Sequence, residues 1–452
     1  MWVPYAPHDK TPWDLRRVVH LHRRAGFAAT WAELQRDLAD GPGVSIDRLV
    51  KGNGRSQGVP DDFERIAGLL ADAAVPSGDA ARLKAWWIYR MLFSPDPLGE
   101  RLTVMWHNHF ATSNLKVRDL AAMRRQNEIF GEFARAPFGE LLPRVVKDPA
   151  MLVWLDAQAN RKGHPNENLA REIMEVFTLG VGNYTETDVK EAARSLTGWT
   201  VKNGEFREHD QSHDDGDKTI FGHTGRWRGD DLVRMLLEHP ATSRRLAFRI
   251  CELFMGEEAV TPDAFDQLAD GLREHELNIG WAVETVLRSE AFCSDRNIGN
   301  RVRGPVEFVV GSVRALEMFD PPPSTLILAE WCAALGQDLF YPPNVFGWPG
   351  GRSWITSRSI IGRTNFASAL VDGSLRSPAS PVDGLGLAQK NGSVRELTDG
   401  IDFFSQLLLG QPATSELTER TLDNLRSQPA IDPATLRYVI ASVLSSAEAQ
   451  LG

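Results

Sequence analysis

Cysteine is scarce in this chain, with three residues among 452, and they lie far apart at Cys251, Cys293 and Cys332. No Cys-x-x-Cys pair occurs. Such an odd and sparse set excludes a disulfide framework and indicates a reducing compartment. We expect each thiol to be a small buried side chain rather than a nucleophile.

Long apolar runs are also lacking, because no stretch approaches the roughly 20 residues that a membrane-spanning helix needs. The N-terminus has no basic segment followed by an apolar one, as a secretory signal would have. These absences predict a cytoplasmic protein without a membrane span. Several enzyme motifs are missing as well: Walker A, Gly-x-Gly-x-x-Gly after a strand, His-Glu-x-x-His and Gly-x-Ser-x-Gly.

The charge balance is acidic, with 60 Asp and Glu residues against 50 Lys and Arg residues and a net charge of −10. No long run of Lys or Arg interrupts this balance. It disfavours broad binding to phosphate backbones, so we expect no nucleic-acid partner. Hydrophobic residues make up 42% of the chain, which is typical of a folded globular protein.

Helical patterns occupy most of the sequence. Thr30, with Glu33 three residues later, has the form of a capping box at a helix start. Asp79–Phe93 and Pro262–Glu274 are further helix candidates with clear start or stop signals. The sequence therefore predicts an all-α, multi-helix globular protein.

One polar stretch, residues 200–227, lacks helical periodicity and is rich in Gly, Asp and His. We expect a loop or small hairpin there, with residues 198–202 paired to residues 219–222. The predicted fold therefore includes one minor β-hairpin around residues 198–224. A polar segment of this length inside a compact protein is usually functional or disordered.

Breaks in composition suggest the domain organisation. Residues 1–372 form the expected main helical domain, which includes the polar loop 200–227 and a Pro/Gly/Trp loop at 341–351. A segment rich in Ser, Gly and Pro follows at 373–395 and predicts a linker. The remainder, 396–452, has the pattern of three short helices.

His107 and His109 stand in a helical pattern with an apolar stripe that includes Trp106. On a helix, a step of about 100° per residue puts the two histidines on nearly opposite sides, so they cannot bind one metal ion together. His109 is either a core histidine with a hydrogen-bonded neighbour or a site residue. Each histidine therefore remains a separate candidate.

The helix predicted between Pro165 and Gly180 carries the most informative polar residues. Asn168, Glu172 and Glu175 share one flank of its apolar stripe. Glu172 borders the stripe, and a half-buried carboxylate needs a partner or has a raised pKa. It is therefore a candidate general acid or base. The alternative is an internal salt bridge to an arginine such as Arg194.

Two loops hold further candidates. His213 and Asp214 lie in the polar loop, where histidine beside carboxylates can bind a metal or move protons. A solvated turn is the alternative interpretation. Asn344 and Trp348 lie in the proline-stiffened loop, which can line a binding site or fasten the edge of a domain.

Several motifs, spread from about His20 to Arg363, resemble the bacterial family known as "domain of unknown function 1800". They are His22–Phe27, Trp106–Ser113, Lys147–Leu152, Trp154–Asp156, Pro165–Asn168, Ala170–Glu172, Glu191–Arg194, Thr197–Trp199, His213–Gly216, Pro342–Val345 and Gly347–Gly351. Many relatives are exported and accompanied by a sulfatase-like protein. The resemblance therefore implies such a companion, although this chain shows no leader.

Two hypotheses of function follow. The first is an enzyme with a polar centre of His, Asp, Glu and Asn side chains, dependent on a divalent metal. In it the catalytic candidates are Glu172, His109, His213 and Asp156, the substrate-binding candidates are Asn168, Arg171, Asn344 and Trp348, and the metal candidates are His107, Glu167 and Asp214. The alternative is a non-catalytic scaffold or partner-binding protein in which these residues are internal clamps. Convergence on one open cleft favours the enzyme, and dispersion into separate salt bridges favours the scaffold.

Overall fold

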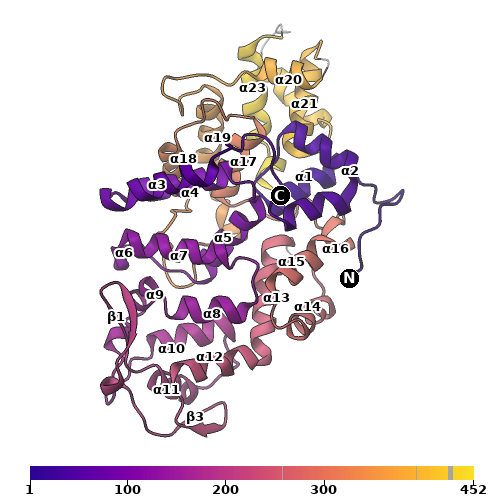
Figure 1. Cartoon of the computed structure of the whole chain (residues 1–452). Helices are drawn as coiled ribbons and strands as arrows, with labels where there is room; N and C mark the ends of the chain where they lie inside the picture. Colours follow the sequence, from indigo (N-terminus) through magenta and orange to yellow (C-terminus); the bar gives the residue numbers. More distant parts are fainter. Residues whose placement is uncertain (257, 393, 426–430) are drawn as a thin grey trace.

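The structure is a computed structural model, and it describes residues 1–256, 258–392, 394–425 and 431–452. Helices dominate these residues, and the strands form two small antiparallel pairs. The prediction of an all-α protein with a minor β element is confirmed. Figure 1 shows an elongated molecule whose N-terminal and C-terminal helices share one end, while the middle of the chain forms the other.

The elements follow one another in three groups. The N-terminal group is α1 (Leu15–Ala25), α2 (Trp31–Val50), α3 (Phe63–Ser77), α4 (Ala80–Phe93) and α5 (Pro97–His109). The middle group is α6 (Asn114–Val117), α7 (Leu120–Glu132), α8 (Phe138–Val146), α9 (Pro149–Trp154), η1 (Ala157–Ala159), α10 (Asn168–Glu172), η2 (Ile173–Thr178), α11 (Glu186–Ser195), β1 (Trp199–Lys202), β2 (Glu205–Glu208), η3 (Asp210–Ser212), β3 (Lys218–Ile220), β4 (His223–Gly225), α12 (Gly229–Glu238), α13 (Pro240–Phe254), α14 (Pro262–Glu274), α15 (Ile279–Leu287) and α16 (Glu290–Cys293). The C-terminal group is α17 (Pro305–Ala315), α18 (Thr325–Ala334), η4 (Gly351–Trp354), α19 (Ser357–Val371), α20 (Gly384–Asn391), α21 (Leu397–Leu409), α22 (Ser415–Asn424), α23 (Pro433–Leu444) and η5 (Glu448–Gln450).

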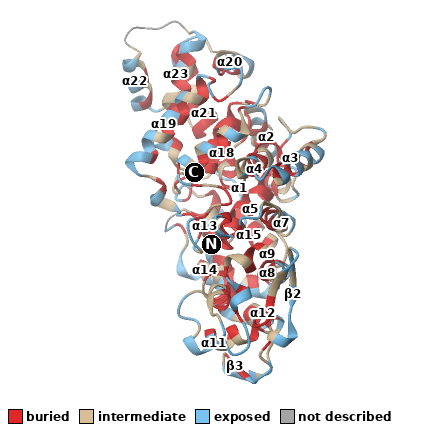
Figure 2. Cartoon of the chain, turned by 90° about the vertical axis from the view of Figure 1, so that its left-hand side faces the viewer, coloured by how far each residue is buried: buried red, intermediate tan, exposed pale blue. Residues whose placement is uncertain are grey.

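The buried apolar side chains form two clusters. Helices α1 and α5 contribute to both clusters and so join them: Val104 of α5 belongs to the first, and Leu102 and Trp106 belong to the second. In Figure 2 the buried residues run along these central helices, whereas the strand region at the lower end is largely exposed. The candidate linker contains α20, and α21 and α23 pack together.

The strand pairing differs from the expectation. β1 pairs with β2, and β3 pairs with β4, so residues 198–202 do not pair with residues 219–222. The first pair is joined by Asn203 and Gly204 and the second by Phe221 and Gly222, and all four residues have positive φ. Two consecutive residues with positive φ form the tight turn that matches the twist of an antiparallel pair. Local closure therefore replaces the longer-range pairing.

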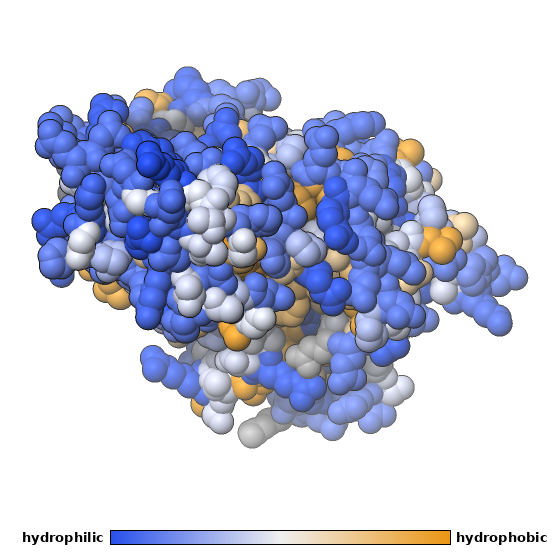
Figure 3. Space-filling model, turned by 90° about the horizontal axis from the view of Figure 1, so that it is seen from below, coloured by the Kyte–Doolittle hydropathy of each residue, from blue (hydrophilic) through white to orange (hydrophobic). Residues whose placement is uncertain are grey.

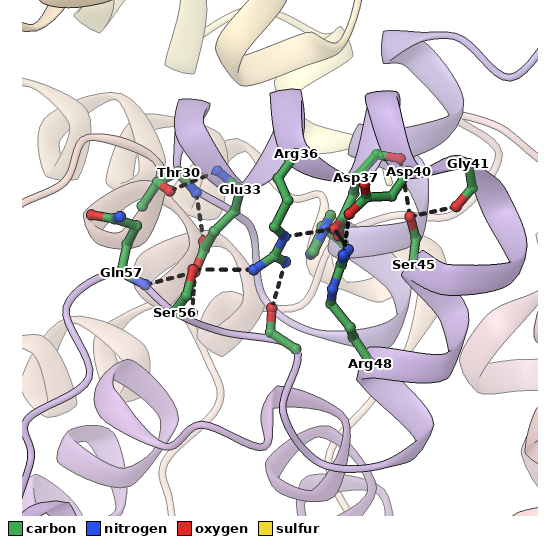
Figure 4. Close-up of polar contacts among 12 residues, drawn as sticks. Thr30, Glu33, Arg36, Asp37, Asp40, Gly41, Ser45, Arg48, Ser56 and Gln57 are labelled. Atoms are coloured by element: carbon green, nitrogen blue, oxygen red, sulfur yellow. Dashed lines mark hydrogen bonds and ion pairs between the residues drawn. The ribbon is translucent and has the colours of Figure 1, made fainter.

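The predicted capping box at the start of α2 is confirmed. The Thr30 hydroxyl accepts from the Glu33 backbone, and the Glu33 carboxylate accepts from the Thr30 backbone N–H at 3.0 Å. Figure 4 shows that the same carboxylate also accepts the backbone N–H groups of Ser56 and Gln57. Arg314, from α17, completes the site at 3.2 Å.

A second buried carboxylate, Asp37, lies one turn further along α2. It bonds His22 at 2.7 Å and also pairs with Arg36 and Arg48. The helix then bends at Gly41, which has a φ of 81° and precedes a proline. These contacts fix α2 against α1 and against the segment that follows α2.

Replacing Glu33 with glutamine is expected to leave the fully buried Arg314 charge without an anion. Such a loss costs on the order of 3–5 kcal/mol of unfolding free energy, measurable by urea denaturation at pH 7. Arg65→Ala, which breaks an ion pair whose side chains are 64% and 44% exposed, should cost less than about 1 kcal/mol. Equal losses in the two variants would contradict this prediction.

The same pair gives the stability a pH dependence. Burial alone would raise the pKa of Glu33, but Arg314 and the backbone N–H groups outweigh it and lower the pKa from 4.5 to about 2. The stabilisation is therefore complete above pH 4.5 and is lost as the pH falls toward 2. Glu33→Gln should remove this part of the acid sensitivity.

Candidate functional site

A cleft of about 800 Å³ lies between helices from all three groups of elements. Helices α5 and α13 and the first turns of α14 and α17 line it, together with the loop that leads into η4. Ligand sites in proteins commonly have volumes of 300–1,000 Å³. The volume of this cleft falls within that range, which makes it a candidate ligand site.

Helix α5 supplies the back of the cleft. Every residue of this helix is buried except Asn108. Arg101, Val104, Met105 and Asn108 line the cleft at spacings of three or four residues, as one face of a helix requires. Asn108, the one residue of α5 that is not buried, therefore faces this cleft.

An ion cluster forms the floor. Glu307, on the fully buried helix α17, pairs with Arg101 of α5 and with Arg301, the latter at 2.5 Å. Burial alone would raise the pKa of Glu307, but the two guanidinium groups outweigh it and lower the pKa to about 2. Two positive charges thus share one negative charge at the floor.

The loop predicted as rigid forms one wall. Its Trp348 is buried, donates its backbone N–H to Asn108 Oδ1 at 2.6 Å, and donates its indole N–H to the Asp338 carbonyl. Gly347 has a φ of 87°, and a Cβ there would overlap Asn108 Oδ1. Asn344 instead lies exposed and accepts the Phe346 backbone N–H, away from the cleft lining.

The two histidines of α5 occupy separate aromatic surroundings, as the helical geometry predicts. The His107 ring packs against Trp87, Phe340 and Trp348, and neither of its nitrogens has a partner among the described residues. Burial lowers the pKa of His107 to about 3. His109 donates Nε2–H to the Phe177 carbonyl at 3.0 Å. Burial, aided by Arg249 and Arg245, lowers its pKa well below the usual value.

Glu172 lies at the end of α10, where the helix widens into the π-helix η2. It is partly buried, and no described residue bonds to its carboxylate. Burial first, and then the neighbouring Glu175, raise its pKa to about 7. Glu175 itself accepts the Tyr184 hydroxyl at 2.5 Å. This pair lies outside the lining of the cleft.

Arg194 binds other carboxylates than Glu172. It bonds Asp214 at 2.8 Å and Glu191 at 2.7 Å. The hydrogen bond from Arg194 is the main cause of the low pKa of Asp214, about 2. The adjacent His213 is buried and donates Nδ1–H to the Thr197 carbonyl at 2.9 Å. These contacts tie the polar loop to the end of α11.

The remaining candidates form two partly exposed ion pairs. Asp156 pairs with Lys116 at 2.7 Å and accepts a long hydrogen bond from Asn168. Glu167 pairs with Arg171 at 2.9 Å, and Arg171 also bonds an exposed glutamate of α11. Asp156 and Asn168 are thus brought together, and so are Glu167 and Arg171.

The predicted residues therefore divide among several contact clusters, and Trp348 alone among them lines the cleft. Arg101, Glu307 and Gln337 were missed. Their signal was weak: a charged residue within an apolar run, such as Pro305–Val310 around Glu307. Among the described residues no three His, Cys, Asp or Glu side chains are grouped to hold a metal ion. The divalent metal site of the first hypothesis, with His107, Glu167 and Asp214 as its candidates, stays a prediction.

Comparison with known protein families identifies the family of this chain. The sequence pattern of the family described as "Protein of unknown function (DUF1800)" matches residues 20–451. The chain belongs to this family. The match includes every cleft-lining residue as well as α20 to α23. No curated protein and no solved structure matches the chain.

No helix in the described part of this family member is long and apolar enough to cross a membrane. All three cysteines are buried and unpaired, as expected. Seen from below, the molecule presents a largely hydrophilic surface with small, scattered hydrophobic patches (Figure 3).

Replacing Glu172 with glutamine is expected to stabilise the protein at pH 8. Its raised pKa means that between pH 4.5 and 7 the folded chain holds a proton that the unfolded chain has lost, so the wild type loses stability as the pH rises through this window. Removing the charge should recover on the order of 1 kcal/mol, discounted for partial exposure. Thermal melting at pH 5 and pH 8 measures the difference.

The matched control is Glu186→Gln, which neutralises an exposed partner of Arg171 and should bring no gain at either pH. A loss of several kcal/mol in Glu172→Gln would instead identify Glu172 as a structural clamp.

Proposed function

We propose that this protein binds a small organic molecule in the cleft between α5, α13 and α17. The single observation that carries the proposal is the combination of an 800 Å³ volume with a lining drawn from distant parts of the chain. Apolar side chains such as Met105, Phe248 and Trp354 alternate there with charged ones. Mixed linings of this kind bury a ligand body while a few polar groups orient it.

Two features support the cleft as a preformed site. The Trp348 backbone and indole are both fixed by hydrogen bonds, and the Arg101–Glu307–Arg301 cluster fixes the floor. Side chains held before binding reduce the entropy lost on association. The cleft is thus suited to a ligand of defined shape.

The enzyme and scaffold hypotheses stay predictions, each with its own support. The raised pKa of Glu172 and the lack of a described partner support an acid–base role. The pairing of Asp214 with Arg194, of Glu167 with Arg171 and of Asp156 with Lys116 supports internal clamps. Binding in the cleft is compatible with either hypothesis, because substrates and effectors need the same volume.

The sulfatase-like companion implied by the family resemblance also stays a prediction, as does the cytoplasmic location. Affinity purification of the tagged chain from its native host, followed by mass spectrometry, tests the companion directly. Recovery of the chain without a sulfatase-like protein would count against it.

The binding proposal is tested with N-phenyl-1-naphthylamine, an uncharged probe that fluoresces in apolar surroundings. We expect saturable binding at one site per chain. Gly350→Trp should weaken it at least about tenfold, because Gly350 lines the cleft, and a Cβ there has only Glu252 nearby, at 3.8 Å. The added indole therefore extends into open space within the cleft.

Gly43→Trp is the matched control. It adds the same indole at an exposed glycine of α2 with nothing within 4 Å, so probe affinity should stay within about twofold of the wild type. Equal affinity of the probe for Gly350→Trp and the wild type would refute the proposal.

A further inference from the structure

Two side-chain amides in the cleft have their oxygens already occupied. Asn108 Oδ1 accepts the Trp348 backbone N–H at 2.6 Å, and Gln337 Oε1 accepts the Val306 backbone N–H at 3.1 Å. A backbone N–H can be met only by the amide oxygen, which fixes the orientation of each amide. The NH₂ group of each amide is therefore the part left for the cleft, and neither has a partner among the described residues.

The guanidinium groups of the floor also retain unused donors. Arg101 donates Nε–H to the Arg24 carbonyl, and its Nη2 forms an ion pair with Glu307. Arg301 donates from Nη2 to the same carboxylate. Within the described residues, Nη1 of Arg101 and Nη1 of Arg301 meet no acceptor. Both Glu307 oxygens are engaged by these two arginines. The floor thus presents a net positive charge and donors.

Trp354 adds a further donor. Its side chain lines the cleft, and its indole N–H has no partner in the described part of the chain. Apart from Glu307, the acidic lining residues are exposed and lie at the mouth: Glu252 pairs with Arg249, Asp266 pairs with Arg244, and Glu258 is exposed. The floor and the mouth of the cleft therefore differ in chemistry.

From this arrangement we infer that the ligand is an organic anion, whose carboxylate, sulfonate or phosphate group binds the unused donors that Arg101, Arg301, Gln337 and Asn108 present to the cleft. This inference rests on the proposed binding function and adds the chemical class. Oxyanions carry only hydrogen-bond acceptors, so they can accept hydrogen bonds from all of these donors. A neutral group that is itself a donor would leave the cleft donors without partners. The ligand's apolar body contacts the Trp354 side of the cleft.

The test compares two probes that differ only by one acidic group. N-phenyl-1-naphthylamine is neutral, and 8-anilinonaphthalene-1-sulfonate is its sulfonated counterpart. We expect the sulfonate to bind the same site at least about tenfold more tightly, because charge-assisted hydrogen bonds add to the shared apolar contact. Gly350→Trp should weaken both probes, which places both in the cleft.

Gln337→Glu and Asn108→Asp isolate the donors. Each variant keeps the oxygen that accepts the backbone N–H and replaces the NH₂ group with a charged oxygen. Sulfonate affinity should fall at least about tenfold in each, and by a clearly larger factor than neutral-probe affinity. Gln35→Glu, which adds the same charge at an exposed residue of α2, should leave both affinities unchanged. Thermal melting of each variant confirms that it is folded.

A competition experiment then compares the carboxylate, sulfonate and phosphate groups. Benzoate, benzenesulfonate and phenyl phosphate are each titrated against the bound sulfonate probe, and displacement by at least one is expected. The inference is overturned if the sulfonate binds no more tightly than the neutral probe, if both amide variants leave its affinity unchanged, or if none of the three acids displaces it. The proposed binding function would still stand after those results if the neutral probe binds in the cleft. Failure of both probes to bind at the cleft would remove the proposed function as well.

Discussion

Charges on helices with no exposed face constrain this fold more than any other feature. All residues of α17 are buried, and so are all but one of α5, yet both helices carry acidic and basic side chains. A buried charge is tolerated only with a partner, so each one must bond to another element. Glu100 of α5 pairs with Arg90 of α4 at 2.9 Å, and Arg314 of α17 pairs with Glu33 of α2. The first pair joins two helices of the N-terminal group, and the second ties the C-terminal group to it.

The cleft follows from the same constraint. Arg101 reaches Glu307 across the junction of α5 and α17, and Arg301 reaches it from the segment before α17. One carboxylate cannot use the donors of two guanidinium groups, since each offers five N–H groups and the carboxylate has two oxygens. The fold therefore leaves surplus donors where its two buried helices meet. Structural charge pairing and ligand recognition share one set of residues at this point.

Local signals made the helices predictable. Thr30 and Glu33 cap α2, and Pro262 begins α14, through contacts within four residues. The predicted hairpin pairing was wrong because it joined strands that are distant in sequence. The Asn203–Gly204 turn, which is a strong local signal, instead pairs β1 with the adjacent β2. The cleft could not be predicted, because Arg101, Glu307 and Gln337 are far apart in sequence and no periodicity links them. Trp348 was found since proline and glycine mark its loop as rigid.

Asn108 shows how closely the wall of the cleft depends on the central helix. The loop approaches α5 so tightly that a side chain at Gly347 would overlap the Asn108 amide. The hydrogen bond from the Trp348 backbone N–H to Asn108 Oδ1 holds the loop in place and, by occupying the oxygen, turns the NH₂ group toward the cleft. A side chain without that oxygen would lose the loop contact and the donor together. Loop position and donor orientation are therefore two consequences of one hydrogen bond, made by the single residue of α5 that is not buried.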